Sequence, residues 1–204
     1  MDTRRARPET PYPPPAVSVL MSAHNAEPYL RDAVTSLLAQ TVPNFELVVI
    51  DDASSDDSPR TLLELAEQDP RIHIHTNKER RGLATSLNDG MELCRAPLIA
   101  RADADDLYHP SRLEKQLAFM RDNPDYGVVS CGNHRIDESG THLRTDAPLQ
   151  GDSFIRFRMN LMNCLLHPGV VFRKQIVQDA GGYNPSYWTA QDSELWSRLR
   201  LDTR

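Results

Sequence analysis

The chain of 204 residues is long enough to bury a substantial core, and 39% hydrophobic with 25% charged residues is the composition of a globular protein. Its net charge of −6 excludes the broad basic field that attracts nucleic acid, so no nucleic-acid partner is expected. No stretch approaches the roughly 18 consecutive apolar residues that a membrane span requires. The three cysteines are widely spaced and contain no Cys-x-x-Cys pair, which indicates reduced core thiols in a cytoplasmic protein.

The first 15 residues combine three arginines with five prolines and lack the apolar run of a secretory signal. We expect residues 1–15 to be a disordered or extended tail. Residues 16–204 are then expected to form a single folded domain.

Short apolar runs alternate with segments of helical spacing from residue 17 onward. Because strand and helix alternate four times with short links, the pattern predicts an α/β fold with a mostly parallel central sheet and helices on both faces. The predicted strands are 17–21, 46–50, 71–75 and 98–101, and the predicted helices are 29–40, one after the capping residues 54–57, and 83–94.

The rhythm changes after residue 110, where strands and helices no longer alternate regularly. The expected elements are a helix at 111–120, a strand at 126–130, a hairpin-like excursion at 134–143, a helix at 154–161, a strand at 169–172 and a helix at 192–201.

Polar residues follow three of the four predicted parallel strands. The turn 22–25 follows the first strand, Asp51 and Asp52 follow the second, and 103–106 follows the fourth. Ligands of such sheets bind beyond the carboxyl ends of the strands, so these groups are expected to form one site.

The last of these groups contains three carboxylates, Asp103, Asp105 and Asp106, within four residues. Side chains alternate along a strand, so Asp103 and Asp105 point the same way and repel unless a cation lies between them. A divalent metal, Mn²⁺ or Mg²⁺, suits such oxygen ligands together with substrate phosphates. The alternative is a solvated acidic loop.

The order of short motifs along the chain resembles the family 2 glycosyltransferases, which share the GT-A, or nucleotide-diphospho-sugar transferase, fold, a Rossmann-like architecture. The match runs from about residue 17 to residue 201. Its motifs are Val17-Ser18-Val19, His24-Asn25, Asp51-Asp52-Ala53-Ser54-Ser55-Asp56, Asn88-Asp89-Gly90, Asp103-Ala104-Asp105-Asp106, His167-Pro168-Gly169, Gly181-Gly182-Tyr183 and Gln191-Asp192-Ser193-Glu194-Leu195-Trp196.

The resemblance implies a nucleotide-sugar donor site in the first half of the chain. A carboxylate can accept a hydrogen bond from a base N–H, which fits a nucleobase near Asp52; helix capping is the alternative role for Asp51 and Asp52. The implied donor-binding residues are Ser22, His24, Asn25, Asp51, Asp52, Arg81 toward the diphosphate or ribose, and Asp103 toward the ribose. The implied metal ligands are Asp105, Asp106 and His167.

The resemblance also makes Asp192 the general base. It would take the proton of an acceptor hydroxyl that attacks the anomeric carbon opposite the leaving nucleotide, which inverts the configuration. The alternative is that Asp192 only caps its helix. His24 and Gln191 depart from the family, which commonly has tyrosine and glutamate at these positions.

The expected activity is thus a metal-dependent, inverting sugar transfer in the synthesis of cell-surface polysaccharide or glycoconjugate. The resemblance favours a UDP-sugar donor, a glycan or lipid-linked acceptor, and a cytoplasmic enzyme that can associate with the inner face of the membrane. Arg204 lies only twelve residues after Asp192, so we expect the C-terminal extension usual in the family to be missing.

Two alternatives stay open at the level of sequence. A nucleotidyltransferase can use a related sheet and paired aspartates, although the turn 22–25 lacks the Gly-rich, basic loop expected of one. A truncated domain that binds nucleotide-sugar without turning it over is the other.

Overall fold

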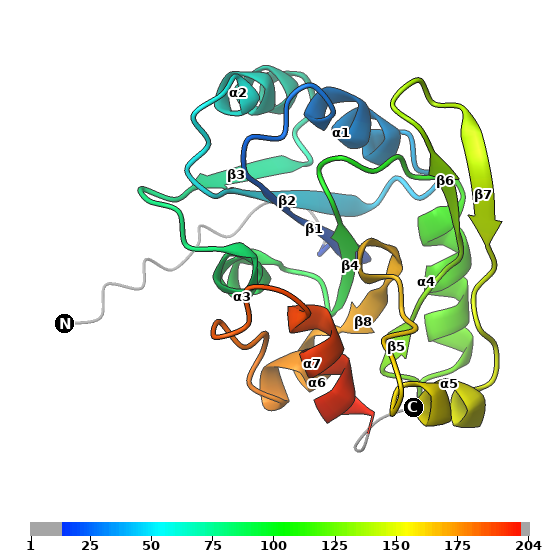
Figure 1. Cartoon of the computed structure of the whole chain (residues 1–204). Coiled ribbons are helices and arrows are strands. Elements are labelled where there is room, and N and C mark those ends of the chain that lie inside the picture. Colours follow the sequence, from blue (N-terminus) through cyan, green and yellow to red (C-terminus); the bar gives the residue numbers. More distant parts are fainter. Residues whose placement is uncertain (1–13, 201–204) are drawn as a thin grey trace.

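The computed structural model describes residues 14–200, which form a central six-stranded sheet covered on both faces by helices (Figure 1). The strand order is β3-β2-β1-β4-β8-β5, and only β8 runs antiparallel to its neighbours. This arrangement confirms the predicted mostly parallel sheet. The strands are β1 (Val17–Ala23), β2 (Phe45–Asp51), β3 (Ile72–Thr76), β4 (Leu98–Ala102), β5 (Val128–Val129) and β8 (Val171–Arg173).

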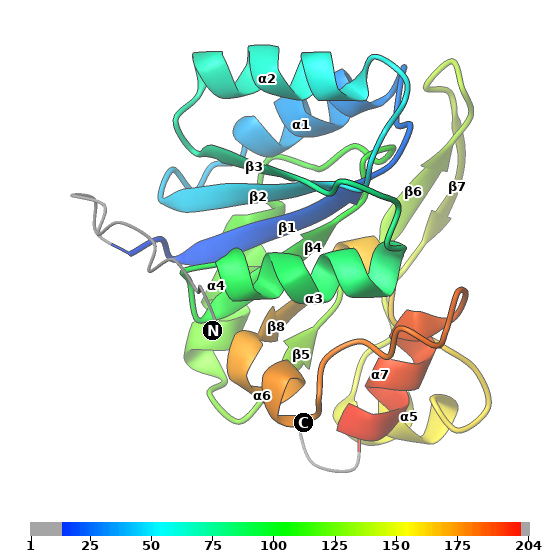
Figure 2. The same cartoon turned by 90° about the vertical axis from the view of Figure 1, so that its left-hand side faces the viewer.

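The helices divide between two layers that cover opposite faces of the sheet (Figure 2). One hydrophobic cluster joins the sheet to α1 (Leu30–Leu38), α2 (Ser58–Gln68) and α4 (Arg112–Asp122). The second cluster joins the opposite face to α3 (Leu83–Leu93), α6 (Lys174–Asp179) and α7 (Gln191–Leu199).

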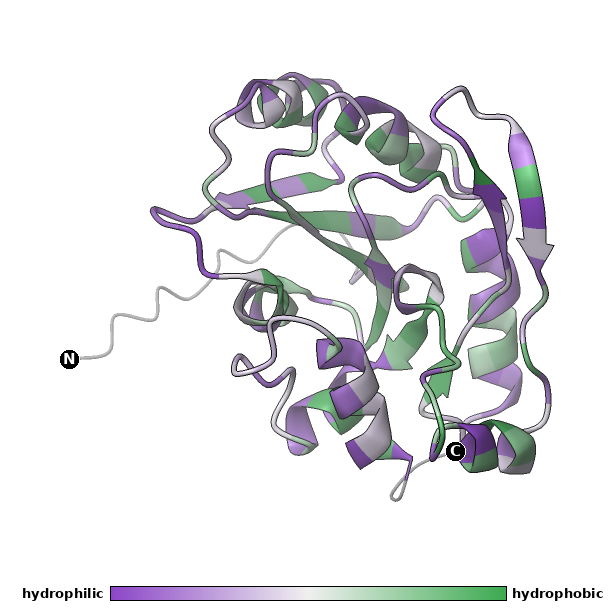
Figure 3. Ribbon diagram, in the orientation of Figure 1, coloured by the Kyte–Doolittle hydropathy of each residue, from purple (hydrophilic) through white to green (hydrophobic). Residues whose placement is uncertain are grey.

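The alternation of side chains along β1 explains why the sheet needs both layers. Val17, Val19 and Met21 belong to the first cluster, whereas Leu20 belongs to the second. A parallel strand buried on both faces has no solvent side, so nearly all its residues are apolar. Hydrophobic residues are accordingly concentrated in the strands, and the outer helix faces are more hydrophilic (Figure 3).

Helix α3 approaches the sheet closely because Gly90 has no side chain. A Cβ atom placed on Gly90 would lie 2.4 Å from Leu20 Cδ1 and 3.0 Å from Ile50 Cγ1. The close contact sets the position of α3, whose N-terminal end borders the functional site.

A separate hairpin, β6 (Asn133–Ile136) and β7 (His142–Asp146), confirms the predicted excursion and stands apart from the six-stranded sheet (Figure 1). It leads to α5 (Asp152–Arg158), a helix with no buried residue. Before β8 the chain forms a short 3-10 turn, η1 (His167–Gly169).

Two elements of the structure, β5 and α6, differ from the prediction. The strand expected at 126–130 is only the two residues of β5, and α6 has no counterpart among the predictions. Residues 1–13 of the predicted tail, and the end of the helix predicted to reach 201, lie outside the described residues; Pro15 is buried beside β1. Cys94 is buried as expected, while Cys131 and Cys164 are only half-buried, and none of the three forms a disulfide within residues 14–200.

Within residues 14–200, no helix combines the length and the apolar character that crossing a bilayer would need.

Candidate functional site

The carboxyl ends of β1 and β2 carry the first part of the site. Ser22 is half-buried near the end of β1, and the turn that follows is locked to the loop after β2. His24 Nδ1 lies 2.8 Å from the carbonyl oxygen of Asp52. Asn25 adopts a φ of 49°, and its Oδ1 accepts a hydrogen bond of 2.8 Å from the N–H of Ser55. These contacts give His24 and Asn25 fixed positions at the sheet edge.

Asp51 and Asp52 are both buried, and they differ in the number of hydrogen bonds that their carboxylates accept from the protein. Asp51 Oδ1 accepts a hydrogen bond from the N–H of Ser54 at 3.1 Å, whereas its buried Oδ2 has no hydrogen-bond partner among the described residues. Asp52 accepts three bonds: Asn77 Nδ2 at 2.7 Å, the N–H of Arg81 at 2.8 Å and the N–H of Gly82 at 2.8 Å.

Asp52 therefore holds the turn that begins α3. Burial by itself raises the pKa of Asp52, but the hydrogen bonds from Arg81, Asn77 and Gly82 outweigh it and hold the pKa below its usual value. Gly82 has a φ of +83°, which only glycine adopts without strain. Sequence reasoning missed this role, because the spacing of Asp52 and Gly82 carries no signal of their contact.

The guanidinium of Arg81, predicted to bind the donor, extends from the same turn. It is half-exposed and pairs with the carboxylate of Asp89 on α3. The structure thus places Arg81 beside Asp52 at the edge of the sheet, with its charge already balanced.

The three carboxylates after β4 do come together. The ligand oxygens of Asp103, Asp105 and Asp106 all lie within 4.8 Å of one another. Burial, followed by the charges of Asp103 and Asp105, raises the pKa of Asp106 to about 6. A group of oxygen ligands that repel each other this strongly fits a hard divalent cation.

Arg101 is the neighbouring cation that sequence reasoning did not select. Its side chain, 1% exposed, lies on β4 and forms an ion pair with Asp103. Nε and Nη2 of this guanidinium have no hydrogen-bond partner among residues 14–200. A buried guanidinium with unused donors is costly unless nearby carboxylates compensate it. An arginine inside an apolar strand, two residues before an acidic motif, was the available signal.

His167 was predicted as a metal ligand, yet the structure does not place it in the carboxylate cluster. Its Nε2 lies 3.0 Å from the hydroxyl of Tyr183, and its ring lies against Trp196. Burial and, to a smaller extent, the charge of Arg101 lower the pKa of His167 to about 2, so the ring is neutral. This arrangement does not support a ligand role for His167.

Asp192 lies in the first turn of α7. The residue at the N-cap is Ala190, and no side chain caps the helix, so the capping alternative for Asp192 is wrong. Asn163 donates a hydrogen bond of 2.6 Å from Nδ2 to Asp192 Oδ2. Asn163 comes from an irregular segment 29 residues earlier, and nothing in the sequence indicated it.

The charges of Asp103 in the carboxylate cluster and of Asp192 both act on Tyr183. Burial raises the pKa of Tyr183 above its usual value, and the charges of Asp192 and Asp103 raise it further, against the opposing charge of Arg101. One buried hydroxyl thus lies in the field of both predicted halves of the site. The first half contains the donor residues and the second contains the candidate base.

Comparison with known proteins decides the family. A model described as "Glycosyl transferase family 2" matches residues 18–181. The chain belongs to glycosyl transferase family 2. It is 32% identical over 186 residues to the O-antigen biosynthesis glycosyltransferase WbnJ of Escherichia coli, a match that covers 90% of this chain and 71% of WbnJ.

Two solved structures share the fold. One is the mannosyltransferase PcManGT of Pyrobaculum calidifontis in complex with GDP-Man and Mn²⁺, with a TM-score of 0.71, 21% identity and coverage of 91% of this chain and 52% of that one. The other is S. aureus TarS 1–349 in complex with UDP-GlcNAc, with a TM-score of 0.72, 19% identity and coverage of 91% and 53%. At these identities the likeness establishes the GT-A fold alone.

The family assignment confirms the glycosyltransferase class and decides against the nucleotidyltransferase alternative. The chain spans about half the length of the two solved proteins.

Proposed function

We propose that this glycosyltransferase domain moves a sugar from a nucleotide-diphospho-sugar to a hydroxyl acceptor with inversion at the anomeric carbon. The observation that carries the proposal is the close cluster of three carboxylates, together with Asp192, whose charge acts with that of Asp103 on the buried Tyr183. An inverting transfer needs these two functions on opposite sides of one carbon atom.

In this proposal Asp103, Asp105 and Asp106 hold the divalent cation, Mn²⁺ or Mg²⁺. The cation supplies charge neutralisation on the departing diphosphate. The pKa of Asp106 is raised first by burial and then by the charges of Asp103 and Asp105, and a bound cation would relieve that repulsion. The Mn²⁺ in the PcManGT complex agrees with this ion type.

Asp192 takes the proton from the acceptor hydroxyl. The oxygen then forms its bond to the anomeric carbon as the bond from that carbon to the diphosphate oxygen breaks. The hydrogen bond from Asn163 to Oδ2 orients the carboxylate, and Oδ1, which has only a long contact of 3.5 Å from Ser193 Oγ, is the oxygen proposed to face the acceptor. Asn163 is therefore a positioning residue in this scheme.

The nucleobase would dock at the edge formed by Ser22, His24, Asn25 and Asp51, with Arg81 near the diphosphate or ribose. The buried, unpartnered Oδ2 of Asp51 supports a polar ligand or water there. We take a UDP-sugar as the first candidate donor and GDP-mannose as the second, since the two fold neighbours hold UDP-GlcNAc and GDP-Man.

The proposed acceptor is a glycan or lipid-linked hydroxyl in cell-surface polysaccharide synthesis, which the naming of WbnJ for O-antigen biosynthesis supports. We further propose a cytoplasmic placement with contact to the inner membrane face. Exposed Phe154, Phe157, Leu161 and Met162 lie together with Arg156 and Arg158 on and after α5, the composition of a segment that binds an anionic lipid surface.

The test is release of nucleoside diphosphate from UDP-sugars and GDP-mannose, with and without acceptor glycans, in Mn²⁺ or in chelator. We expect Asp105→Ala to reproduce the effect of chelator, because it removes the exposed ligand of the cluster. Asp125→Ala, an exposed aspartate away from the cluster, serves as the matched control. Equal nucleotide affinity in chelator and in Mn²⁺ would overturn the metal-dependent scheme.

A further inference from the structure

The segment between α6 and α7 presents two aromatic side chains to solvent. Trp188 is 80% exposed and Tyr187 is 46% exposed, whereas Tyr183 and Trp196 nearby are each 1% exposed. A single exposed aromatic residue is ordinary on a protein surface. Here the two sit against a pocket, and that combination needs an explanation.

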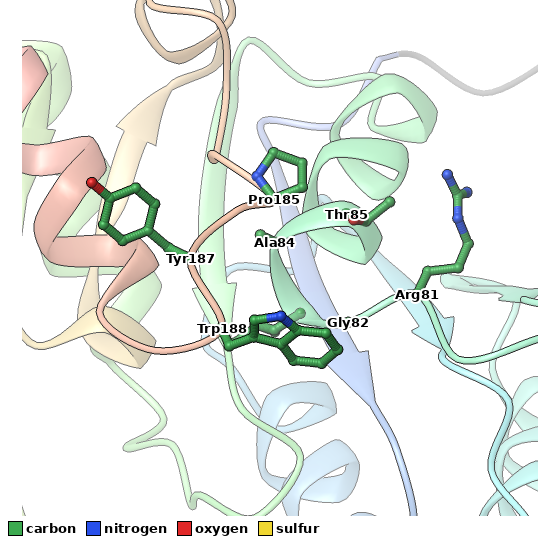
Figure 4. Close-up of a pocket in the computed structure, with 8 residues that line it drawn as sticks. Arg81, Gly82, Ala84, Thr85, Pro185, Tyr187 and Trp188 are labelled. Atoms are coloured by element: carbon green, nitrogen blue, oxygen red, sulfur yellow. The ribbon is translucent and has the colours of Figure 1, made fainter.

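The pocket is shallow, about 30 Å³, and lies between this segment and the start of α3 (Figure 4). A Cβ atom on Gly82 would lie 3.9 Å from Trp188 Cζ3, so the edge of the indole lies next to the backbone of Gly82. Figure 4 shows Tyr187 and Arg81 on opposite sides of the indole. Such a hollow suits a ligand that lies flat across it. Its lining includes Arg81, Gly82, Thr85, Pro185, Tyr187 and Trp188.

The segment that carries Trp188 is anchored. Asn88 on α3 donates to the carbonyl of Tyr183 at 2.7 Å and accepts from its N–H at 2.8 Å. Arg198 on α7 donates to the carbonyl of Gly182 at 2.7 Å, and the N–H of Tyr187 donates to the carbonyl of Asn184 at 3.1 Å. Two helices therefore hold the backbone at Gly182 and Tyr183, six and five residues before Trp188.

The charge and position of the pocket limit the classes of ligand that can fit it. The guanidinium of Arg81, the one charged group among the described residues of the lining, is paired with Asp89, so the rest of the lining is neutral and suits an uncharged ring. The backbone N–H of Gly82 is bound to Asp52, and Trp188 precedes Asp192 by four residues. The indole thus contacts the proposed donor-binding turn at Gly82 and belongs to the segment that leads into the proposed base.

We propose that Trp188 is a stacking platform for a neutral pyranose ring, with Thr85 and Arg81 at the rim as hydrogen-bonding groups for its hydroxyls. The C–H face of a pyranose is apolar and matches an indole, while the hydroxyls at its edge need polar partners. The inference rests on the proposed function for its sugar chemistry. The ring belongs either to the acceptor or to the sugar of the donor.

The chain offers a direct probe because it has only two tryptophans, one exposed and one buried. Acrylamide, a neutral quencher, should reach Trp188 and not Trp196. The quenched fraction should disappear in Trp188→Phe, which assigns it. Ligands are then added in Mn²⁺: UDP, GDP, UDP-sugars, GDP-mannose, and neutral methyl pyranosides or oligosaccharides.

We expect a sugar-bearing ligand to reduce quenching of the exposed fraction at least twofold, and UDP or GDP alone to leave it unchanged. Protection by neutral glycosides identifies the acceptor ring, and protection by nucleotide-sugars alone identifies the donor ring. Equal protection by the bare nucleotide, or no protection by any sugar, overturns the proposal.

Trp188→Ala should weaken affinity for the protecting sugar about fivefold to tenfold, the scale of one aromatic contact. Phe119→Ala removes an aromatic side chain that is also exposed, on α4, and should leave that affinity unchanged. Failure of the platform and failure of the proposed function are distinguishable. If glycosides protect Trp188 but no metal-dependent nucleotide binding is found, the stacking proposal stands and the proposed function is wrong. If metal-dependent transfer occurs without protection of Trp188, the proposed function stands and the stacking proposal is wrong.

Discussion

Asp52 has a structural role in the fold and a proposed role in nucleotide binding. Its carboxylate accepts bonds from Asn77, Arg81 and Gly82, so one residue at the end of β2 fixes the turn that starts α3. A change here must therefore be judged by stability as well as by nucleotide affinity. Sequence reasoning placed Asp52 at the correct strand end, but the three donors come from residues 25 to 30 positions away and carry no sequence signal.

Asp52→Asn is expected to lower the free energy of unfolding at pH 7 by about 1–3 kcal/mol, since one N–H donor would face an amide instead of a carboxylate. The pKa of Asp52 is lowered in the folded protein, so the unfolded state takes up its proton first as the pH falls. The stability that Asp52 contributes is present above about pH 4 and is lost below it.

Urea unfolding of wild type and variant between pH 3 and pH 8 measures this difference. It should be largest at neutral pH and shrink toward pH 3. A difference that does not vary with pH would show that the charge of Asp52 plays no part.

Arg101 is expected to weaken cation binding by the carboxylate cluster while it holds Asp103. Burial and the neighbouring carboxylates raise the pKa of Asp106, and the charge of the buried Arg101 guanidinium opposes that rise. Arg101 therefore places a positive charge near the site where a divalent cation would bind. Arg101→Met should therefore strengthen Mn²⁺ binding in the absence of nucleotide by about threefold to tenfold, as removal of a like charge predicts. Arg101→Lys keeps the charge and is the matched control in a calorimetric titration. Weaker Mn²⁺ binding by Arg101→Met would mean that positioning of Asp103 dominates.

At the scale of elements, strands and helices with a strong pattern were predicted within a few residues, and the weakly patterned ones were not. The strands β1 to β4 are buried runs bounded by polar turns, so their sequence specifies them. Helix α6 has six residues and buries only Val177, too few for a helical period. Strand β5 exists only because β8 pairs with it at the sheet edge, which is a long-range contact.

The anchoring of the Trp188 segment to α3 also depends on such a long-range contact. Asn88→Ala removes both hydrogen bonds to Tyr183 and is expected to cost about 1–3 kcal/mol of stability, because the backbone groups of a buried residue lose their partners. Hydrogen exchange should increase in residues 183–188 while the strands stay protected.

Gln178→Ala is the matched control, since Gln178 also contacts α3, through an exposed bond of 2.8 Å to Glu92. It should be close to neutral in stability. Unchanged exchange in residues 183–188 of Asn88→Ala would mean that Arg198 alone holds the segment.

On the scale of the whole molecule, the chain assembles its site from two halves. The ends of β1, β2 and β4 supply the proposed donor residues, and the chain after β8 returns across α3 to supply Asp192 and the Trp188 segment (Figure 1). The motif order in the sequence predicted both halves and their fold. Their junction at Tyr183 could not be predicted, because it depends on side chains that meet only in the folded chain. The charges of Arg101, Asp103 and Asp192 act on Tyr183, and Asn163 donates a hydrogen bond to Asp192.

The two halves should be separable by Asp192→Asn. The N-cap of α7 is Ala190, and an amide can still accept the bond from Asn163, so the fold and the affinity for nucleotide with Mn²⁺ should change less than about twofold. Transfer to acceptor should fall on the order of 10²–10⁴-fold, the contribution of a general base. Asn163→Ala, which leaves the carboxylate and removes only its hydrogen bond, should reduce transfer by less. Retained transfer in Asp192→Asn would place the base elsewhere, and a wild-type chain that binds donor but transfers to no acceptor would be a binding domain whose second half is inactive.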